Sequence, residues 1–167
     1  MLGYFKVRIC KHILGHTLVD QNSKRAFLIK RYCLTKLREG NSIAKTVRIV
    51  GPVYSHCVLS IGDDTFIGSA FRCEGNGHVT IGKNCDIAPQ VTILTGTHHI
   101  GDTSHRAGKG ITTDVTIGDG TWIGACSIIL PGIRIGQGCV IGAGSVVTKD
   151  MPDNTLAKGV PAKFSAL

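Results

Sequence analysis

Aromatic side chains are scarce in this sequence of 167 residues, at 5%, although 43% of the residues are hydrophobic. The core must therefore be aliphatic and assembled from many small contacts. Long apolar runs are missing as well, and no segment approaches the ~20 apolar residues that cross a bilayer. The apolar residues near the N-terminus are interrupted by Lys6, Arg8 and Lys11, so a signal peptide is not expected.

Paired cysteines are also missing. The seven cysteines include no C-x-x-C pair and no zinc-ligand spacing. This pattern favours reduced thiols in the core of a cytoplasmic protein, and no metal is predicted. The sequence has no P-loop and no G-x-G-x-x-G in a strand–helix context, so nucleotide hydrolysis and hydride transfer gain no support.

Acidic residues are few, at 11 against 19 basic ones, and the net charge is +8. Such a balance indicates an anionic partner, for example nucleic acid, an acidic membrane surface or a phosphorylated ligand. Much of the excess lies within residues 1–48, and a smaller part lies near the C-terminus. This division argues against one continuous nucleic-acid face, and no nucleic-acid partner is predicted.

Glycine, in contrast, is abundant, with 22 residues. Because an interior glycine costs a helix roughly 1 kcal/mol, this content favours a turn-rich β architecture. Many of the glycines belong to a repeat of six residues, in which an aliphatic residue is followed by a small one. The pairs are Ile61-Gly62, Ile67-Gly68, Ile81-Gly82, Ile87-Ala88, Ile117-Gly118, Ile123-Gly124, Ile135-Gly136 and Ile141-Gly142. A period of six fits neither an amphipathic helix nor a simple strand alternation, and it indicates a solenoid.

Each repeat is interpreted as a short strand plus a corner, so that three repeats make a coil of 18 residues. The inward aliphatic residues are then expected to stack between coils, with Ile117 on Ile135, Ile123 on Ile141 and Ile129 on Val147. Two interruptions are predicted: a small corner at residues 79–80 and a longer charged segment at residues 99–116. The longer segment should project as a loop, and projecting loops on rigid scaffolds tend to carry function.

Residues 1–42 lack the repeat and form the first predicted region, followed by a solenoid domain over 43–152 and a tail over 153–167. Residues 26–40 are expected to form an amphipathic helix that caps the open end of the solenoid. The apolar residues predicted to make this cap are Phe27, Leu28, Tyr32, Leu34 and Leu37. The basic residues of the same helix leave peripheral contact with anionic lipid or a lipid-linked glycan as an alternative.

Four further segments accompany the repeat: TGTHH (95–99), DGTWIGACSIILPG (119–132), IGAGSVVTKD (141–150) and GVPAK (159–163). With them, residues 43–163 resemble the hexapeptide-repeat acyltransferases, most closely the branch that O-acetylates sugars and surface polysaccharides. The resemblance implies an all-β fold, namely a left-handed parallel β-helix with a short α-helical N-terminal segment and a projecting loop. It also implies a homotrimer, with acetyl-CoA bound in the cleft between adjacent subunits.

Acetyl transfer from a thioester to a hydroxyl needs a base that removes the hydroxyl proton. His98 matches the catalytic histidine of the family and lies where the long loop leaves the repeat, so it is the predicted general base. His99 is the alternative, because adjacent residues of an extended chain face opposite ways. The candidates for contact with a sugar acceptor are Glu74, His99, His105 and Arg106. For Glu74, His105 and Arg106, a solvated surface role is the alternative.

The resemblance assigns coenzyme A contacts to Trp122, Gly124, Ala125, Ala143, Thr148, Lys149 and Lys163. Small residues let an extended pantetheine arm approach the backbone, and lysines meet phosphates as point charges. Some relatives have arginine at the position of Lys163, and lysine cannot bind phosphate in the bidentate manner of arginine. Trp122 is equally compatible with a structural role at a corner.

Several other functions stay open on the sequence alone. A γ-class carbonic anhydrase shares the fold but needs a zinc ion bound by three histidines from two faces. Serine acetyltransferase has a large helical N-terminal domain, for which residues 1–42 leave no room. The remaining alternatives are acetylation of an antibiotic of the streptogramin type, acetylation of an amino sugar, and a non-catalytic trimeric scaffold.

Overall fold

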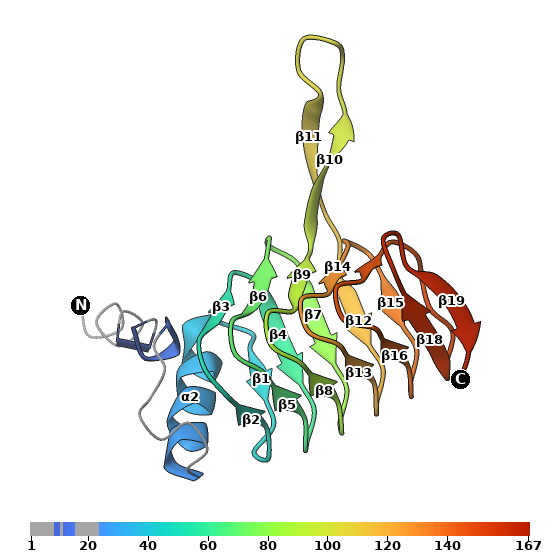
Figure 1. Ribbon diagram of the computed structural model, residues 1–167. Helices are drawn as coiled ribbons and strands as arrows, with labels where there is room; N and C mark the ends of the chain where they lie inside the picture. The colour runs from blue at the N-terminus through green and yellow to red at the C-terminus, as the bar shows by residue number, and fades with distance from the viewer. Residues whose placement is uncertain (1–8, 11, 16–23) are drawn as a thin grey trace.

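The computed structural model describes residues 9–10, 12–15 and 24–167. Helix α2 (Lys24–Leu37) precedes a series of short strands that wind into stacked coils, and a two-stranded projection stands out from them (Figure 1). Three sheets, called faces A, B and C below, line the coils, and their strands follow one another in that order along the chain. The predicted parallel β-helix with an N-terminal helix and a projection is confirmed.

Each face is built from strands of successive coils. Face A contains β1 (Ser42–Ile43), β4 (Val58–Ile61), β7 (His78–Ile81), β12 (Val115–Ile117) and β15 (Arg134–Ile135). Face B contains β2 (Arg48–Ile49), β5 (Phe66–Ile67), β8 (Asp86–Ile87), β13 (Trp122–Ile123), β16 (Val140–Ile141), β18 (Thr155–Lys158) and β19 (Lys163–Ala166). Face C contains β3 (Val53–Ser55), β6 (Phe71–Glu74), β9 (Thr92–Leu94), β14 (Ile128–Ile129) and β17 (Val146–Val147).

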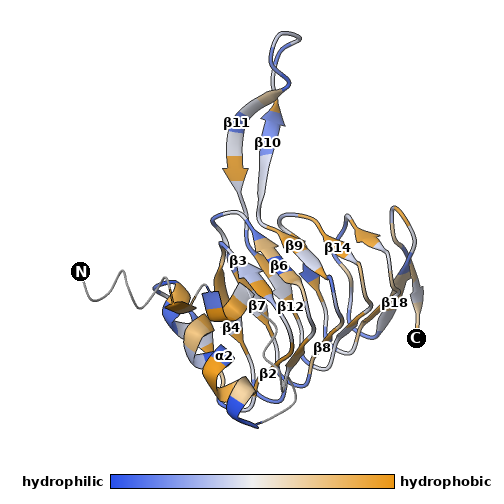
Figure 2. Ribbon diagram, turned by 60° about the vertical axis from the view of Figure 1, so that its left-hand side comes forward, coloured by the Kyte–Doolittle hydropathy of each residue, from blue (hydrophilic) through white to orange (hydrophobic). Residues whose placement is uncertain are grey.

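The core is the interior of the coil. Ile117 pairs with Ile135, Ile123 with Ile141 and Ile129 with Val147, as the repeat predicts. All of these side chains are buried, and they continue into one aliphatic column through the earlier coils. Hydrophobic and hydrophilic residues therefore alternate along the coils (Figure 2), because successive residues of a strand face opposite sides of its sheet.

The first interruption of the repeat lies in a different place from the one predicted. Ser55 pairs with Cys73 at a spacing of 18 residues, but Val58 already pairs with His78 at a spacing of 20. The two extra residues therefore lie in the corner between β6 and β7, whereas residues 79–80 are regular members of β7. Gly75 makes this wider corner with a φ of 112°. Residues with a side chain adopt this backbone conformation only with strain.

The second interruption is an antiparallel hairpin, called the arm below, made of β10 (Gly96–Ile100) and β11 (Ala107–Thr112). It begins three residues before the predicted boundary of 99–116, and residues 115–116 belong to β12. Ile81 pairs with Ile117 at a spacing of 36, so the excursion inserts 18 residues beyond the regular 18. The coils on either side therefore stack as though the arm were absent.

The glycines of the repeat serve close packing between coils. A Cβ atom on Gly118 would lie 2.5 Å from the backbone nitrogen of Gln137, and one on Gly124 would lie 2.6 Å from that of Ala143. Positive φ values occur instead at other corner positions, such as Asp64 at 57° and Gly120 at 67°. In the described coils, the repeat glycines are therefore used mainly for close contact between coils.

Helix α2 packs on the N-terminal end of the coils, against β1 and β2. Its buried residues are Ala26, Lys30, Cys33 and Leu34. Leu34 and Leu37 pack toward the core as predicted, but Leu28 and Tyr32 are exposed. The helix is thus rotated from the predicted orientation, and it buries a lysine in place of two apolar residues. Among the described helices, none is long and apolar enough to cross a membrane.

The residues predicted as a tail, 153–167, continue the solenoid instead. β18 pairs in parallel with β16, and β19 folds back antiparallel on β18. The inward residue Ala157 pairs with Ile141 and is fully buried. The prediction missed these strands because the last coil is shorter, with Val140 paired to Leu156 at a spacing of 16.

Candidate active site

The arm carries the predicted general base away from the body of the protein. His98 lies in β10 and pairs with Gly110 of β11. All five residues of β10 are exposed, and Ile100 is 87% exposed. His98 therefore lies on a projecting strand rather than at the surface of a coil (Figure 1).

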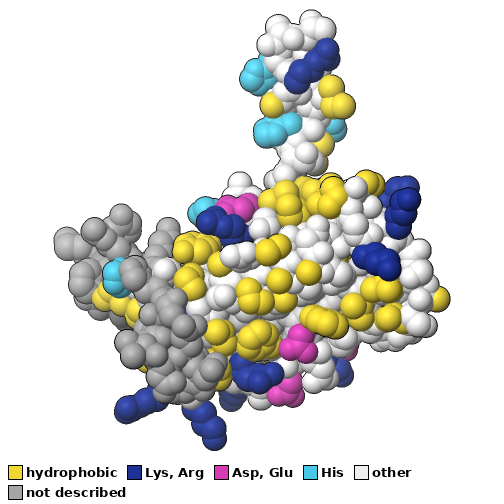
Figure 3. Space-filling model, viewed as in Figure 1, with side chains coloured by type: hydrophobic (Ala, Val, Ile, Leu, Met, Phe, Trp, Pro, Cys, Tyr) yellow, Lys and Arg dark blue, Asp and Glu magenta, His cyan; other side chains and the backbone are white. Residues whose placement is uncertain are grey.

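His98 and His99 differ in their surroundings on the arm. The ring of His98 lies beside Gly110: its Nε2 would be 3.9 Å from a Cβ atom at that position, which is ordinary van der Waals contact. The register shifts between His98 and Ile100, which places His99 at an irregularity of the pairing. Histidine side chains project from more than one side of the arm in Figure 3, in keeping with opposite directions for adjacent residues.

The tip of the arm is a compact turn organised by Asp102. Its carboxylate accepts hydrogen bonds from the backbone nitrogen and the hydroxyl of Ser104, at 2.9 and 2.5 Å, and from the backbone nitrogen of His105. These bonds lower the pKa of Asp102, with the Ser104 hydroxyl as the largest cause. The guanidinium of Arg106 donates to the carbonyl oxygen of Gly101, so this candidate acceptor residue is tied to its own arm.

The foot of the arm is fixed by the buried Thr95. Its hydroxyl accepts a hydrogen bond from the backbone nitrogen of Gly77 and donates to the carbonyl oxygen of Glu74, both at 3.1 Å. The thiol of Cys57 lies 3.4 Å from the same hydroxyl. A hydrogen bond between the Cys57 and Cys73 thiols lowers the pKa of Cys57 and raises that of Cys73.

Glu74 lies at this foot, at the end of β6, within a group that the sequence analysis did not identify. One carboxylate oxygen lies 2.8 Å from Nδ1 of His56, and the other lies 3.5 Å from Nη1 of Arg72. The Arg72 guanidinium lies over the ring of Tyr54, 4.8 Å from its centroid. A signal for this group was present, because Tyr54 and Arg72, and likewise His56 and Glu74, are 18 residues apart.

The predicted coenzyme A contacts fall into three places. Gly124 and Ala125 follow β13 at the corner between faces B and C, and Ala143 lies beside them on the next coil, where the backbone nitrogen of Gly144 donates to the carbonyl oxygen of Ala125. Trp122 lies on face B beside them, with its side chain 55% exposed. Thus four of the seven predicted contacts are brought together.

The other three predicted contacts lie toward the C-terminal end. Thr148 and Lys149 follow β17, on the corner between faces C and A. Lys163 begins β19 on face B, paired with Lys158. The segment between β18 and β19 runs along β17, since Val146 donates to Gly159 and accepts from Ala162.

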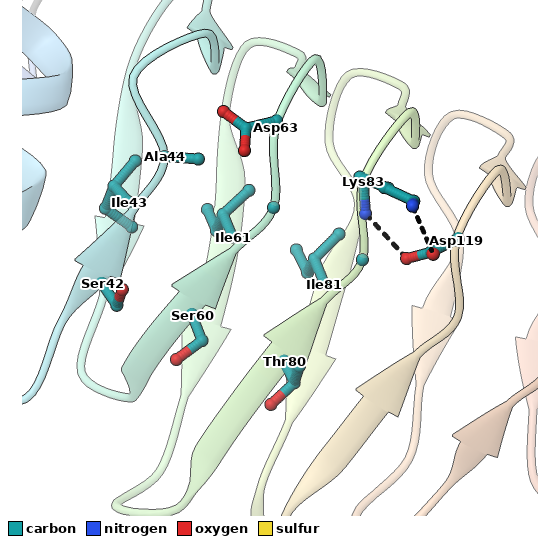
Figure 4. A pocket seen from close by; sticks show the side chains of 12 residues that line it. Ser42, Ile43, Ala44, Ser60, Ile61, Asp63, Thr80, Ile81, Lys83 and Asp119 are labelled. Atoms are coloured by element: carbon teal, nitrogen blue, oxygen red, sulfur yellow. Dashed lines mark hydrogen bonds and ion pairs between the residues drawn. The ribbon is translucent and has the colours of Figure 1, made fainter.

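A separate shallow groove of about 540 Å³ runs along face A, and none of the predicted site residues lines it. Figure 4 shows Ser42, Ser60 and Thr80 in a row on successive strands, with Lys83 and Asp119 at one side. The Asp119 carboxylate accepts from the Lys83 backbone nitrogen at 2.9 Å and lies 3.8 Å from its amine. Within the described residues, no group of three or more His, Cys, Asp or Glu side chains is placed to hold a metal ion.

Within a single chain, the arm stands clear of the coils (Figure 3). His98, on this arm, therefore does not adjoin the four predicted coenzyme A contacts that are brought together at the corner between faces B and C. The histidine and the small-residue corner are thus separate parts of the surface.

Comparisons with known proteins match both the repeat and the whole fold. The family model "Bacterial transferase hexapeptide (six repeats)" matches residues 114–149, and "Hexapeptide repeat of succinyl-transferase" matches residues 58–93. The chain is 36% identical over 155 residues to the galactoside O-acetyltransferase of Escherichia coli K12, across 89% of this chain and 71% of that protein.

Two solved structures extend the likeness to three dimensions. The maltose O-acetyltransferase from Clostridium difficile 630 superposes with a TM-score of 0.75 at 32% identity, covering 99% of this chain and 87% of that one. A hexapeptide-repeat acetyltransferase from Vibrio cholerae, complexed with acetyl coenzyme A, gives a TM-score of 0.77 at 26% identity, covering 98% and 85%. The chain therefore belongs to the hexapeptide-repeat acetyltransferase family.

Proposed function

We propose that the protein is an acetyl-CoA-dependent O-acetyltransferase that acts on a sugar hydroxyl in the cytoplasm, in the biosynthesis of surface polysaccharide. Relatives that are named for galactoside and maltose O-acetylation support the sugar acceptor. The Vibrio cholerae structure with acetyl coenzyme A supports the donor. The observation that carries the proposal is that one chain holds both an exposed histidine, on an arm whose foot is held by the hydrogen bonds of Thr95, and a corner of small residues on the coils.

The small-residue corner is suited to the donor. Gly124 is buried where adjacent coils touch, Ala125 is half-buried, and Ala143 is exposed at the corner. An extended pantetheine arm can lie there and hydrogen-bond to the backbone, while Trp122 offers a flat apolar wall. Lys149 and Lys163 are exposed, so their amines are free to meet the phosphates of coenzyme A as point charges.

In the proposed mechanism His98 is the general base. Its imidazole takes the proton of the acceptor hydroxyl as the oxygen attacks the thioester carbonyl carbon. The tetrahedral intermediate then breaks its C–S bond, and the imidazolium returns the proton to the departing coenzyme A thiolate. Acetyl ester and free thiol are the products, and the histidine ends in its starting state.

The proposal places each active site between two subunits of a homotrimer, with His98 from one subunit and the small-residue corner from its neighbour. The exposure of the arm supports this arrangement of subunits. Every residue of β10 is exposed, so packing of the arm in a cleft between subunits would bury surface that is otherwise in contact with water. A closed cyclic trimer supplies three identical clefts of this kind.

The proposed activity is tested with purified protein, acetyl-CoA and a panel of mono- and oligosaccharides, by measuring free thiol release and product mass. An increase in sugar mass by one acetyl group is expected for at least one saccharide. A product on an amino-sugar nitrogen would favour the N-acetylating alternative. No binding of acetyl-CoA at millimolar concentration by calorimetry would favour a non-catalytic scaffold, and stoichiometric zinc in the purified protein would revive the carbonic anhydrase alternative.

The role of His98 is tested by comparing His98→Gln with the matched control His99→Gln, because both residues lie on the exposed strand β10. Loss of the base is expected to lower kcat by about 10²- to 10⁴-fold, while His99→Gln stays within a few-fold of the parent. The acetyl-CoA dissociation constant should be unchanged in both variants. A loss that follows His99 and spares His98 would reverse the assignment.

A further inference from the structure

Helix α2 has a second apolar stripe, which faces away from the coils. Its buried residues pack on the coils, whereas Leu28, Ile29 and Tyr32 are 58%, 42% and 55% exposed. Residues three and four apart on a helix are neighbours, so these three side chains form one group. Figure 2, in which the side of the molecule that carries α2 comes forward, shows hydrophobic residues along this helix. A helix that only caps the coils needs one apolar stripe, so the second stripe is not explained by the fold.

Basic side chains flank this exposed apolar group on the same side of the helix. Arg25 lies three residues before Leu28, and Lys36 lies four residues after Tyr32, so one cation stands about a turn away at either end. Both are exposed, as is Lys24 next to Arg25. Among the described residues, none of these three basic side chains forms an ion pair, and α2 itself contains no acidic residue. Their charge is therefore left for a partner outside the described part of the chain.

The other two basic residues of α2 are used inside the protein. The amine of the buried Lys30 donates to the carbonyl oxygen of Gly51, and the guanidinium of Arg31 donates to that of Lys45. Glu39, the first acidic residue after the helix, lies beyond its end. The cations near the coils thus bond to backbone, and those beside the exposed apolar group stay free. The outer face of α2 is defined here by Lys24, Arg25, Leu28, Ile29, Tyr32 and Lys36.

This arrangement matches the surface of a bilayer. A helix that lies in a membrane interface places its apolar side chains at the boundary between headgroups and acyl chains, and its cations meet anionic headgroups. Tyr32 suits the same depth, because an aromatic ring with a polar tip favours the headgroup region. The outer face is the convex side of a single helix, which fits a flat surface better than it fits a peptide or a small ligand.

We infer that the outer face of α2 binds the surface of a membrane that contains anionic lipids, with Leu28, Ile29 and Tyr32 in the headgroup region and Arg25 and Lys36 against lipid phosphates. The inference does not depend on the proposed acetyl transfer. It divides α2 between two tasks, since the inner face caps the coils and the outer face holds the protein on the membrane.

The test measures sedimentation of the full chain with vesicles of phosphatidylcholine alone, and with vesicles of phosphatidylcholine and phosphatidylglycerol in equal parts. Binding to the anionic vesicles is expected to be at least roughly tenfold tighter, because each cation near such a surface contributes about fivefold. Added salt should weaken this binding. Equal binding to the two kinds of vesicle, or no binding to either, would overturn the inference.

The double variant Arg25→Gln, Lys36→Gln tests the cations of the outer face. It should weaken binding to the anionic vesicles by about 20-fold. The matched control is Arg134→Gln, Lys158→Gln, which makes the same change of net charge at exposed positions of β15 and β18. An equal loss in the control would show that net charge alone drives the binding, and it would overturn the assignment to α2.

Tryptophan emission tests whether the apolar group enters the membrane. In the variant Tyr32→Trp, Trp122→Phe, the emission should shift to shorter wavelength when anionic vesicles are added, because the indole leaves water. Trp122 of the parent chain, on face B, should keep its emission. Sedimentation with vesicles but no shift at position 32 would overturn the inference. A shift that appears with protein concentration in the absence of lipid, and that vesicles do not increase, would assign the outer face to a second copy of the chain and overturn it as well.

Discussion

Lys30 illustrates how a single residue departs from the simple pattern of a basic exposed helix. Its side chain projects from α2 and is fully buried, and its amine donates to the carbonyl oxygen of Gly51. Burial lowers the pKa of this amine, because the charged form loses its hydration. Lys30 is therefore unavailable for contact with anionic lipid, and it ties the helix to the first coil.

The buried amine predicts a pH dependence of stability. Between the lowered pKa in the folded state and the ordinary value of 10.5, the unfolded chain binds more protons, so the free energy of unfolding rises with pH across that window. Lys30→Met should remove this rise, whereas Lys36→Met, at an exposed position of the same helix, should retain it. Urea unfolding midpoints at pH 8 and pH 10 measure this rise in each variant. An equal rise of the midpoint with pH in both variants would contradict the assignment of the effect to Lys30.

A second prediction at the scale of single residues concerns the glycines of the coils. Gly118→Ala would bring a Cβ atom to within 2.5 Å of the backbone of Gln137, so two coils must separate and the melting temperature should fall by many degrees. Gly120→Ala introduces no close contact and meets only the unfavourable φ of 67°, at about 1–2 kcal/mol. Thermal unfolding at one protein concentration compares them, and a larger loss at Gly120 would contradict the packing role.

At the scale of elements, the repeat predicts the coils because inward aliphatic residues fix both the strands and their register. The strands of the arm were not predicted, because β10 is exposed along its whole length and carries no apolar alternation. The group around Arg72 and Glu74 was missed because only inward residues were compared at the 18-residue spacing. His98 was found by resemblance to a family, since nothing in the local pattern distinguishes its chemistry from that of His99.

The arm should be removable without loss of the coils. Deleting residues 96–113 takes out 18 residues and leaves Ile93 and Ile117 six positions apart, which restores the uninterrupted repeat. We expect the far-ultraviolet circular dichroism of a β-helix and retained binding of acetyl-CoA, together with loss of transfer. An unfolded product would show that the arm is needed for the fold as well as for the proposed catalysis.

For the whole molecule, the proposed trimer predicts complementation between inactive subunits. His98→Gln lacks the base, and Ala143→Trp fills the exposed small-residue corner, so each homotrimer should be inactive. After mixing in denaturant and refolding together, roughly a quarter of the parent activity should return, because a cleft needs one intact surface from each of two neighbours. If activity does not return although mixed trimers form, the two parts do not belong to one site.

The two ends of the coil stack also determine how long the molecule can become. A stack of parallel coils exposes unpaired backbone groups at each end, which is a template on which further β-structure can grow into filaments. Helix α2 covers one end, and at the other β19 reverses direction on β18. At these covered edges, the described part of the chain presents a helix or a reversed strand to a second molecule in place of a parallel strand, which we expect to disfavour polymerisation along the axis of the coils.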